Sequence, residues 1–116
     1  MGTRRASDEI RLTVPAEVDY VSVLRVATRV VAGRAGFDDD GRSRLLAAAG
    51  AAFFALVRDA AATGSVTSLM RTSRHRVVLE LSASSANPLD PDAVVDIGDG
   101  HELLDGARTL RFWVDR

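Results

Sequence analysis

Residues 10–37, IRLTVPAEVDYVSVLRVATRVVAGRAGF, contain two hydrophobic periods, one after the other. Up to Pro15 apolar and polar residues alternate, which is the period-two pattern of a half-buried β-strand. From about Glu17 to Ala35 the apolar residues recur at helical spacing, and Gly36 fits a helix stop. The apolar face of this predicted helix contains Tyr20, Val23, Leu24, Ala27, Val30 and Val31. The stretch therefore predicts a strand that leads into a long helix with one buried face.

A second long helix is predicted from about Arg42 to Ala62. Its apolar stripe consists of Leu45, Ala49, Ala52, Phe53, Leu56 and Ala60. Three aspartates at residues 38–40 precede this helix. Acidic side chains at a helix start accept free amide N–H groups and favour the positive end of the helix dipole, so we interpret these aspartates as caps. A metal site is the alternative, and it requires a loop that brings neighbouring carboxylates onto one ion.

Hydrophobic alternation predicts further strands at residues 66–72, 76–82 and 110–114, the first two as a hairpin. The segment at residues 83–106 is expected to be mostly irregular, with short helical turns from Pro91 and over residues 102–107. This order predicts an α+β two-layer sandwich, in which two long helices cover one face of a single mixed, mostly antiparallel sheet. We expect one domain over residues 1–116, with residues 1–8 as a frayed tail.

The composition excludes several classes of protein. The 116 residues include 15 basic and 16 acidic side chains, and the formal net charge of -1 argues against a general nucleic-acid-binding protein. The absence of cysteine excludes disulfides, thiolate zinc sites, iron–sulfur clusters and cysteine nucleophiles. No apolar run reaches the ~18–20 residues that cross a bilayer. The polar start at residues 1–9 lacks the apolar core of a secretory signal. We expect a cytoplasmic protein that binds neither nucleic acid nor membranes.

The layout of residues 10–37, followed by an acidic helix start, resembles the histidine-kinase-type (GHKL) ATPase fold in its anti-sigma-factor serine/threonine kinase branch. The resemblance covers most of the chain. In that family the second helix carries a glutamate that activates the attacking hydroxyl or water. Four residues later, on the same helical face, an asparagine holds the magnesium ion that bridges the ATP phosphates.

Aligning residues 45–61, LLAAAGAAFFALVRDAA, with that helix places Ala51 at the glutamate position and Ala55 at the asparagine position. From Leu45 to Val57 the sequence contains no Asn, Gln, Asp, Glu, His, Ser or Thr. Magnesium requires oxygen ligands, so the resemblance implies that this helix has lost both the metal ligand and the base. We therefore expect no catalytic residue, no cofactor and no metal. A buried packing helix is the structural interpretation of the same alanines, and it is compatible with the resemblance.

The family's next motif, Asp-x-Gly-x-Gly, is missing where it is expected, because ASSANPLDP follows the strand at residues 77–82. A formal match occurs later, at residues 96–100, which makes Asp96, Gly98 and Gly100 weak candidates for nucleotide binding. Two acidic side chains near this match, Asp99 and Glu102, would repel phosphates. We prefer to interpret residues 96–100 as a flexible acidic turn.

Two features are candidates for recognition of a protein. Trp113 alternates with Phe112 and Val114, so one of the two aromatic residues lies on the sheet face away from the helices. Arg71 and Arg74 belong to a basic turn, and the segment at residues 90–105 is acidic. These opposite charges attract each other within the chain, across a dimer or toward a charged partner, unless both are simply solvated.

The resemblance implies a non-catalytic protein-interaction module, a degenerate anti-sigma regulatory kinase that has lost its ATP and magnesium motifs. Its expected partner is a protein: a sigma factor, an antagonist of an anti-sigma factor, a related subunit or a second copy of the chain. One alternative is a divergent ATP-binding serine/threonine protein kinase that uses Asp96, Gly98, Asp99 and Gly100. The other alternative is an unrelated α+β dimerisation domain.

Overall fold

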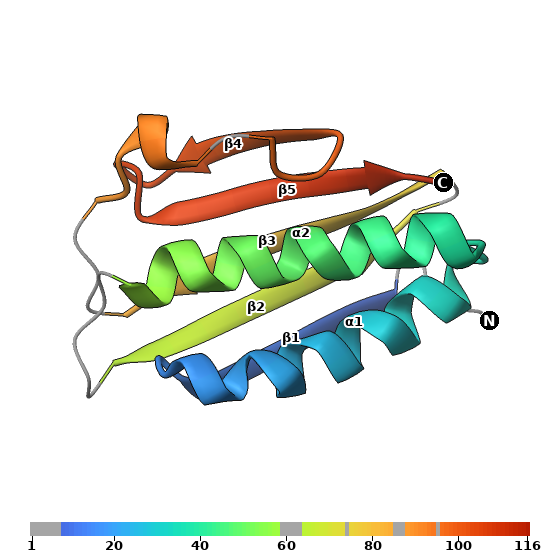
Figure 1. Ribbon diagram of the computed structural model, residues 1–116, viewed down its shortest axis with the longest axis horizontal. Helices are drawn as coiled ribbons and strands as arrows, with labels where there is room; N and C mark the ends of the chain where they lie inside the picture. Colours follow the sequence, from blue (N-terminus) through green and yellow to red (C-terminus); the bar gives the residue numbers. More distant parts are fainter. Residues whose placement is uncertain (1–7, 59–63, 74, 85–87, 95) are drawn as a thin grey trace, which may run out of the picture.

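The computed structural model describes residues 8–58, 64–73, 75–84, 88–94 and 96–116 (Figure 1). Its elements are β1 (Asp8–Pro15), a 3-10 turn η1 (Val18–Tyr20), α1 (Val21–Arg34), α2 (Asp39–Arg58), β2 (Ser65–Thr72), β3 (Arg76–Ala83), a 3-10 turn η2 (Pro91–Ala93), β4 (Gly100–Leu104) and β5 (Thr109–Asp115). The strands form one sheet in the order β1-β2-β3-β5-β4. Both long helices lie on the same face of this sheet, side by side (Figure 1).

The α+β two-layer architecture predicted from the sequence is confirmed, and so is the β2–β3 hairpin. The sheet was expected to be mixed and mostly antiparallel. In the described residues it is purely antiparallel, because all four pairings of neighbouring strands are antiparallel. No helix in the described part of the chain combines the length and the apolar character that a membrane crossing requires.

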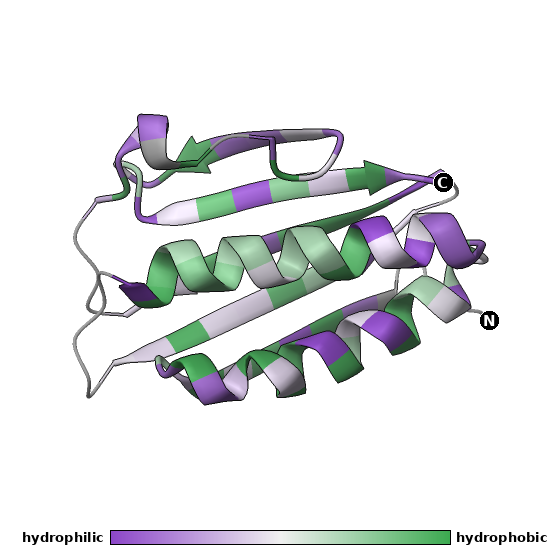
Figure 2. Cartoon of the chain, viewed as in Figure 1, coloured by the Kyte–Doolittle hydropathy of each residue, from purple (hydrophilic) through white to green (hydrophobic). Residues whose placement is uncertain are grey.

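The core lies between the sheet and the two helices. Every second residue is buried along β3 and along β2 as far as Met70, as expected for a sheet with one covered face. Phe53 and Leu56 of α2 pack into the core with Leu79 and Phe112 of the sheet, and all four are fully buried. Figure 2 shows the hydrophobic colouring along the middle and C-terminal part of α2, after a hydrophilic first turn.

Local hydrogen bonds fix the turn between the helices. Gly36 has a φ of 78°, its N–H donates to the Gly33 carbonyl, and the Phe37 N–H donates to the Ala32 carbonyl, which together form a Schellman motif. The Asp38 carboxylate then accepts the Gly41 N–H at 2.8 Å. This contact confirms the cap at Asp38, while Asp39 and Asp40 are the acidic residues of the first turn of α2.

Two sequence-based predictions are wrong. Residues 102–107 were expected as a helical turn, but residues 100–104 form edge strand β4, in which no residue is fully buried and the alternation is weak. The predicted buried face of α1 is wrong in part. Leu24 and Val31 are buried as predicted, but Tyr20, Val23 and Val30 are exposed. The residues that α1 buries are Leu24, Thr28, Val31 and Ala32.

The burial of Thr28 was not predicted because threonine is polar. The Thr28 hydroxyl donates to the Leu24 carbonyl at 2.7 Å inside the helix, so the side chain is satisfied without leaving the core. Valines occur on both sides of α1, and their spacing alone does not distinguish the buried side. Of the α2 stripe, every predicted member is buried except Ala60, which lies outside the described residues.

Two adjacent phenylalanines test the orientation of α2. Phe53→Ala removes a fully buried ring, and we expect a loss of about 3–5 kcal/mol in the free energy of unfolding. Phe54→Ala, at a side chain that is 41% exposed, serves as the matched control and should cost less than about 1 kcal/mol. Urea unfolding followed by circular dichroism measures both. Equal losses would show that α2 is rotated from the orientation described.

Candidate functional site

The alanines that the sequence singles out in α2 differ in their exposure. Ala47 and Ala51 are exposed, whereas Ala55 is buried, with 8% of its surface accessible. Two shallow grooves meet at Ala51. One has a volume of about 390 Å³ and is lined by Arg44, Ala47, Ala48, Ala51, Asp96 and Gly98. The other has a volume of about 360 Å³ and is lined by Val18, Ala51, Phe54, Ala55, Val57 and Arg58.

The structure therefore brings together some of the sequence candidates and separates others. Asp96 and Gly98 lie across the first groove from Ala51. Gly100 does not reach this groove, because it is the cross-strand partner of Trp113 and lies under the indole ring. The described residues contain no cluster of three or more His, Asp or Glu side chains that could hold a metal ion.

The turn at residues 96–100 has a structural role that its short motif did not reveal. Asp96 and Gly98 have φ angles of 55° and 65°, and Gly98 lies directly against the Trp113 carbonyl. The Asp99 N–H donates to the same carbonyl at 2.8 Å, and the Asp99 carboxylate accepts the Asp115 N–H at 2.6 Å. Asp99 is thus engaged by the β5 backbone, which leaves Asp96 as the exposed acid of the groove.

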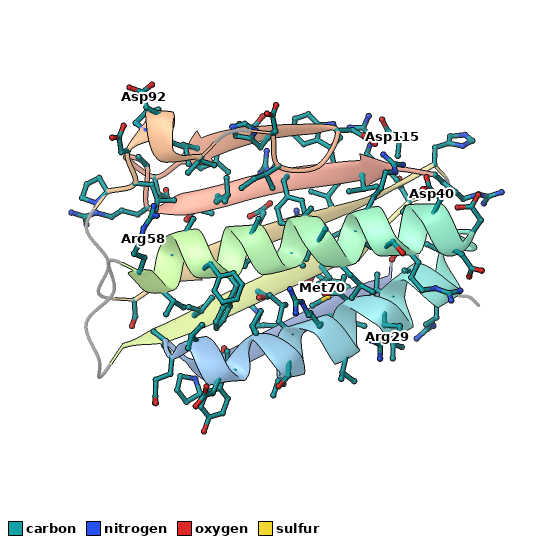
Figure 3. The ribbon with its side chains drawn as sticks, in the orientation of Figure 1. Arg29, Asp40, Arg58, Met70, Asp92 and Asp115 are labelled. Carbon is teal, nitrogen blue, oxygen red and sulfur yellow. The ribbon has the colours of Figure 1, made fainter. Side chains whose placement is uncertain are left out.

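Arg44 of α2 connects this turn to the helix through hydrogen bonds. Its Nη1 donates to Asp99 Oδ1 at 2.7 Å, its Nη2 donates to the Asp115 carbonyl at 3.0 Å, and its Nε lies 3.7 Å from Asp40 Oδ2. Figure 3 shows Asp40 and Asp115 at the same end of the molecule. Sequence reasoning did not identify Arg44, since only its i,i+4 spacing from Asp40 is local. The contact with Asp99 joins residues 55 positions apart.

Other arginines near α2 remain available to a partner. The Arg25 guanidinium of α1 lies over Gly50 of α2, at a place where a side chain on Gly50 would displace it. Arg58 lines the second groove and is labelled at the end of α2 in Figure 3. Neither Arg25 nor Arg58 has an ion-pair partner within the described ranges. The helical layer thus combines a floor of small side chains with cations at its margins.

Trp113 lies on the open face of the sheet, opposite to the side on which Phe112 and Val114 are buried. Its ring lies over Gly100, and the Arg76 guanidinium is 5.4 Å from the ring centroid. Contact with a cross-strand glycine and a cation holds the indole in place. The side chain is half-buried, so only part of it is available to a partner.

Arg71 belongs to a ladder of charges across the same open face. Its guanidinium binds Glu9 at 2.8 Å and Glu80 at 3.4 Å, while Arg111 binds Glu80 at 3.0 Å and Glu102 at 2.9 Å. The hydrogen bond to Glu9, with smaller contributions from the charges of Glu80 and Glu9, raises the pKa of Arg71. These contacts pair the two arginines with three glutamates of this face.

Arg74 lies outside the described residues. In the described part of the chain, no ion pair joins the basic turn to the acidic segment at residues 90–105. The acidic side chains that do form ion pairs bind elsewhere, since Asp99 binds Arg44 and Glu102 binds Arg111. The paired charges of this segment therefore bind arginines of α2 and β5.

The sequence matches no family model and no curated protein at a significant level. The geometry of the α2 face itself supports a functional interpretation. An exposed floor of Ala47 and Ala51, open on both sides, allows another backbone to approach closely. Asp96 and Arg44 supply the charged groups of the first groove, and Arg44 is already ion-paired.

Two glycines with left-handed backbones test the role of the turn. Gly98→Ala and Gly106→Ala both force alanine to a positive φ, which costs about 1–2 kcal/mol. Only at position 98 does the added methyl group also collide with the Trp113 carbonyl. We expect urea unfolding to show a loss at least about 1 kcal/mol larger for Gly98→Ala than for Gly106→Ala. Equal losses would mean that the turn does not need to lie against β5.

Proposed function

We propose that this chain is a non-catalytic protein-interaction module, similar to an anti-sigma regulatory kinase that has lost its ATP and magnesium ligands. The observation that carries the proposal is the presence in α2 of Ala51, which is exposed, and Ala55, which is buried, where the resemblance expects a glutamate and an asparagine. The two-layer fold is compatible with that family, in which a strand is followed by two helices and then by the rest of the sheet.

The chemistry of the groove supports binding without catalysis. A methyl group offers no lone pair to magnesium and accepts no proton from a hydroxyl group. Asp96 contributes one exposed carboxylate, which would repel a phosphate group. Arg44, the cation in the same groove, is held by Asp99 at 2.7 Å. The groove therefore lacks the convergent cations and amides with which proteins bind nucleotide phosphates.

The same surface suits an amphipathic helix of a partner protein. Ala47 and Ala51 allow close approach, and Phe54 supplies a larger apolar contact at 41% exposure. Arg25 and Arg58 favour acidic side chains at the margins of that helix. The proposed partner is a protein with such a helix; a sigma factor, an anti-sigma antagonist or a related subunit are the classes that the resemblance implies.

A divergent ATP-binding serine/threonine kinase is the second candidate, because Asp96 and Gly98 do line a groove of about 390 Å³. It requires this groove to bind the nucleotide with residues other than those of the family. The third candidate, an unrelated α+β dimerisation domain, requires self-association without any further partner.

Isothermal titration calorimetry with ATP and Mg²⁺ distinguishes the first two candidates. We expect no saturable heat up to millimolar ATP, because the groove offers magnesium a single carboxylate, that of Asp96, and its cation Arg44 is already paired with Asp99. Saturable micromolar binding that is lost in Asp96→Ala, together with phosphate transfer to a protein, would support the kinase alternative and overturn the proposal.

A synthetic helical peptide tests the interaction surface. The probe is a fluorescent amphipathic peptide of about 20 residues, with leucines on one face and glutamates on the other. We expect Ala51→Glu to weaken its binding at least ~10-fold, about 1.4 kcal/mol, because the new carboxylate adds bulk and repels the glutamates. Arg108→Glu, which introduces an acid at an exposed turn that lines neither groove, is the charge control and should bind nearly as well as the parent.

Fluorescence anisotropy measures both variants at the same ionic strength. A parent protein that does not bind the peptide, or an Ala51→Glu variant that binds it as tightly as the parent, would remove the α2 face as the site. A peptide of the same composition with lysines in place of glutamates should bind more weakly if Arg25 and Arg58 contribute.

A further inference from the structure

The two grooves that meet at Ala51 carry opposite charges. The first groove contains Asp96, and the second groove contains Arg58. Neither of these side chains forms an ion pair within the part of the chain that the structure describes. The other charge in the first groove, Arg44, lies 2.7 Å from Asp99 and is therefore already neutralised. Each groove thus contains one charge that no described residue neutralises.

These two charges lie at different positions along the axis of α2. Asp96 shares its groove with residues 44–51 of the helix, whereas Arg58 is the last residue of α2. From the middle of that stretch to Arg58 is about ten residues, which at 1.5 Å per residue is roughly 15 Å. Asp40, whose side chain is 87% exposed, lies at the opposite end of α2 from Arg58 (Figure 3). The α2 face is therefore acidic toward the start of the helix and basic toward its end.

The apolar side chains of this face are also unevenly distributed. Val18 and Phe54, which are 52% and 41% exposed, line the groove of Arg58. The groove of Asp96 has no apolar lining residue larger than alanine. A large apolar side chain of a partner therefore fits beside Arg58, and a small one fits beside Asp96. Because charge and size vary together along the face, a partner helix matches both in one direction only.

We propose that the α2 face binds its partner helix in a single direction, antiparallel to α2. This inference rests on the proposed function, which identifies the α2 face as the site, and it adds the sequence pattern of the partner. In an antiparallel register, a partner residue i at Arg58 places residue i+4 at Phe54. In the same register, i+7 lies at Ala51 and i+11 lies at Ala47, beside Asp96. The partner therefore carries an acidic residue at i, a large apolar one at i+4, a small one at i+7 and a basic one at i+11.

The helix dipole favours this direction over the reverse one. Helices ordinarily carry acids in the first turn and bases in the last, because these charges match the dipole. α2 follows this rule, with Asp39 and Asp40 in its first turn and Arg58 in its last. A partner helix with the same pattern is complementary to α2 only when the two are antiparallel. The dipole of α2 does not account for Asp96, which lies outside the helix and adds its carboxylate to the acidic end.

A second copy of this chain does not supply the required pattern. Two α2 helices packed antiparallel about Ala51 would place Arg58 of each opposite Arg44 of the other, so that like charges would meet. From residue 41 to residue 58 the sequence contains no acidic residue that could lie against Arg58 instead. The occupant is therefore a helix of a different protein.

Two fluorescent peptides of identical composition test the direction. Both are helices of about 20 residues with leucine at i+4 and alanine at i+7. The acid-first peptide has glutamate at i and lysine at i+11, and the base-first peptide has these two exchanged. By fluorescence anisotropy at low ionic strength, we expect the parent protein to bind the acid-first peptide at least ~10-fold more tightly, because the exchange turns two attractive pairs into repulsive ones. In 1 M salt, where the Debye length is about 3 Å, the two affinities should become nearly equal.

Neutral variants separate the charges of the protein from the helicity of the peptides. In Arg58→Gln/Asp96→Asn we expect the two affinities to differ by less than ~3-fold, because both ion pairs are lost while the side-chain sizes are kept. Asparagine also tolerates the left-handed backbone of residue 96, which has a φ of 55°. Arg108→Gln/Asp92→Asn is the matched control, since it removes the same charges at exposed positions that line neither groove, and it should keep the ratio of the parent.

The outcomes distinguish this inference from the proposed function on which it rests. If the parent protein binds neither peptide, both the proposed function and the direction are overturned. Equal binding of the two peptides by the parent would overturn the direction alone and leave the α2 face as the site. A preference for the acid-first peptide that persists undiminished in Arg58→Gln/Asp96→Asn would do the same.

A spin label tests the direction without changing the charges of the site. The chain has no cysteine, so Ser43→Cys introduces a single thiol at an exposed position near the acidic end of α2. We expect a nitroxide at this position to broaden the NMR signals from the lysine end of the bound acid-first peptide and to spare those from its glutamate end. Broadening of the glutamate end, alone or equally with the lysine end, would overturn the proposal.

Discussion

The packing of α2 against both the sheet and α1 is the constraint on which the rest of the molecule depends. Leu45, Phe53 and Leu56 are fully buried there, while Ala48, Ala49 and Ala52 keep the helix close to its neighbours. Gly50 has no side chain, and this allows the Arg25 guanidinium to cross from α1 over α2. One side of α2 packs into the core. Much of its outer side presents only the methyl groups of alanines and the phenyl ring of Phe54. The composition of this one helix thus determines both the core and the apolar character of the exposed α2 face.

The parts of the fold that follow from local patterns could be predicted from the sequence. Alternation identified β1, the β2–β3 hairpin and β5, and the acidic start of α2 was correctly interpreted as a cap because the bond from Gly41 to Asp38 spans only three residues. β4 was missed because an edge strand is solvated on both sides, so His101 and Leu103 differ little in burial from Leu104. The buried side of α1 was misplaced because valine occurs around most of the helix, and only the position of α2 decides which side is covered.

For the candidate site too, the sequence shows which residues are present but not how distant residues are brought together. The absence of side-chain oxygens at Ala51 and Ala55 is evident from the sequence, since it concerns only which residues are present. That Asp96 and Gly98 lie opposite Ala51, while Gly100 lies under Trp113, depends on the path of the chain between β3 and β4. Arg44 and Asp99, which are 55 residues apart, have no local pattern that pairs them. Charges on the sheet surface were also ambiguous, because each arginine has several acids within reach once the strands are aligned.

The strand order has a consequence for how the chain folds. The β2–β3 hairpin and the α1–α2 turn join residues that are near in sequence, so each forms with a small loss of loop entropy. β1, in contrast, pairs with β2 through partners as distant as Asp8 and Thr72, across both helices. Contacts of such long sequence separation form slowly, so β1 is the last strand to join on this argument. Until it docks, the edge of β2 is open to pairing with β1 of another chain, and crowded nascent molecules are therefore exposed to exchange of this strand during synthesis.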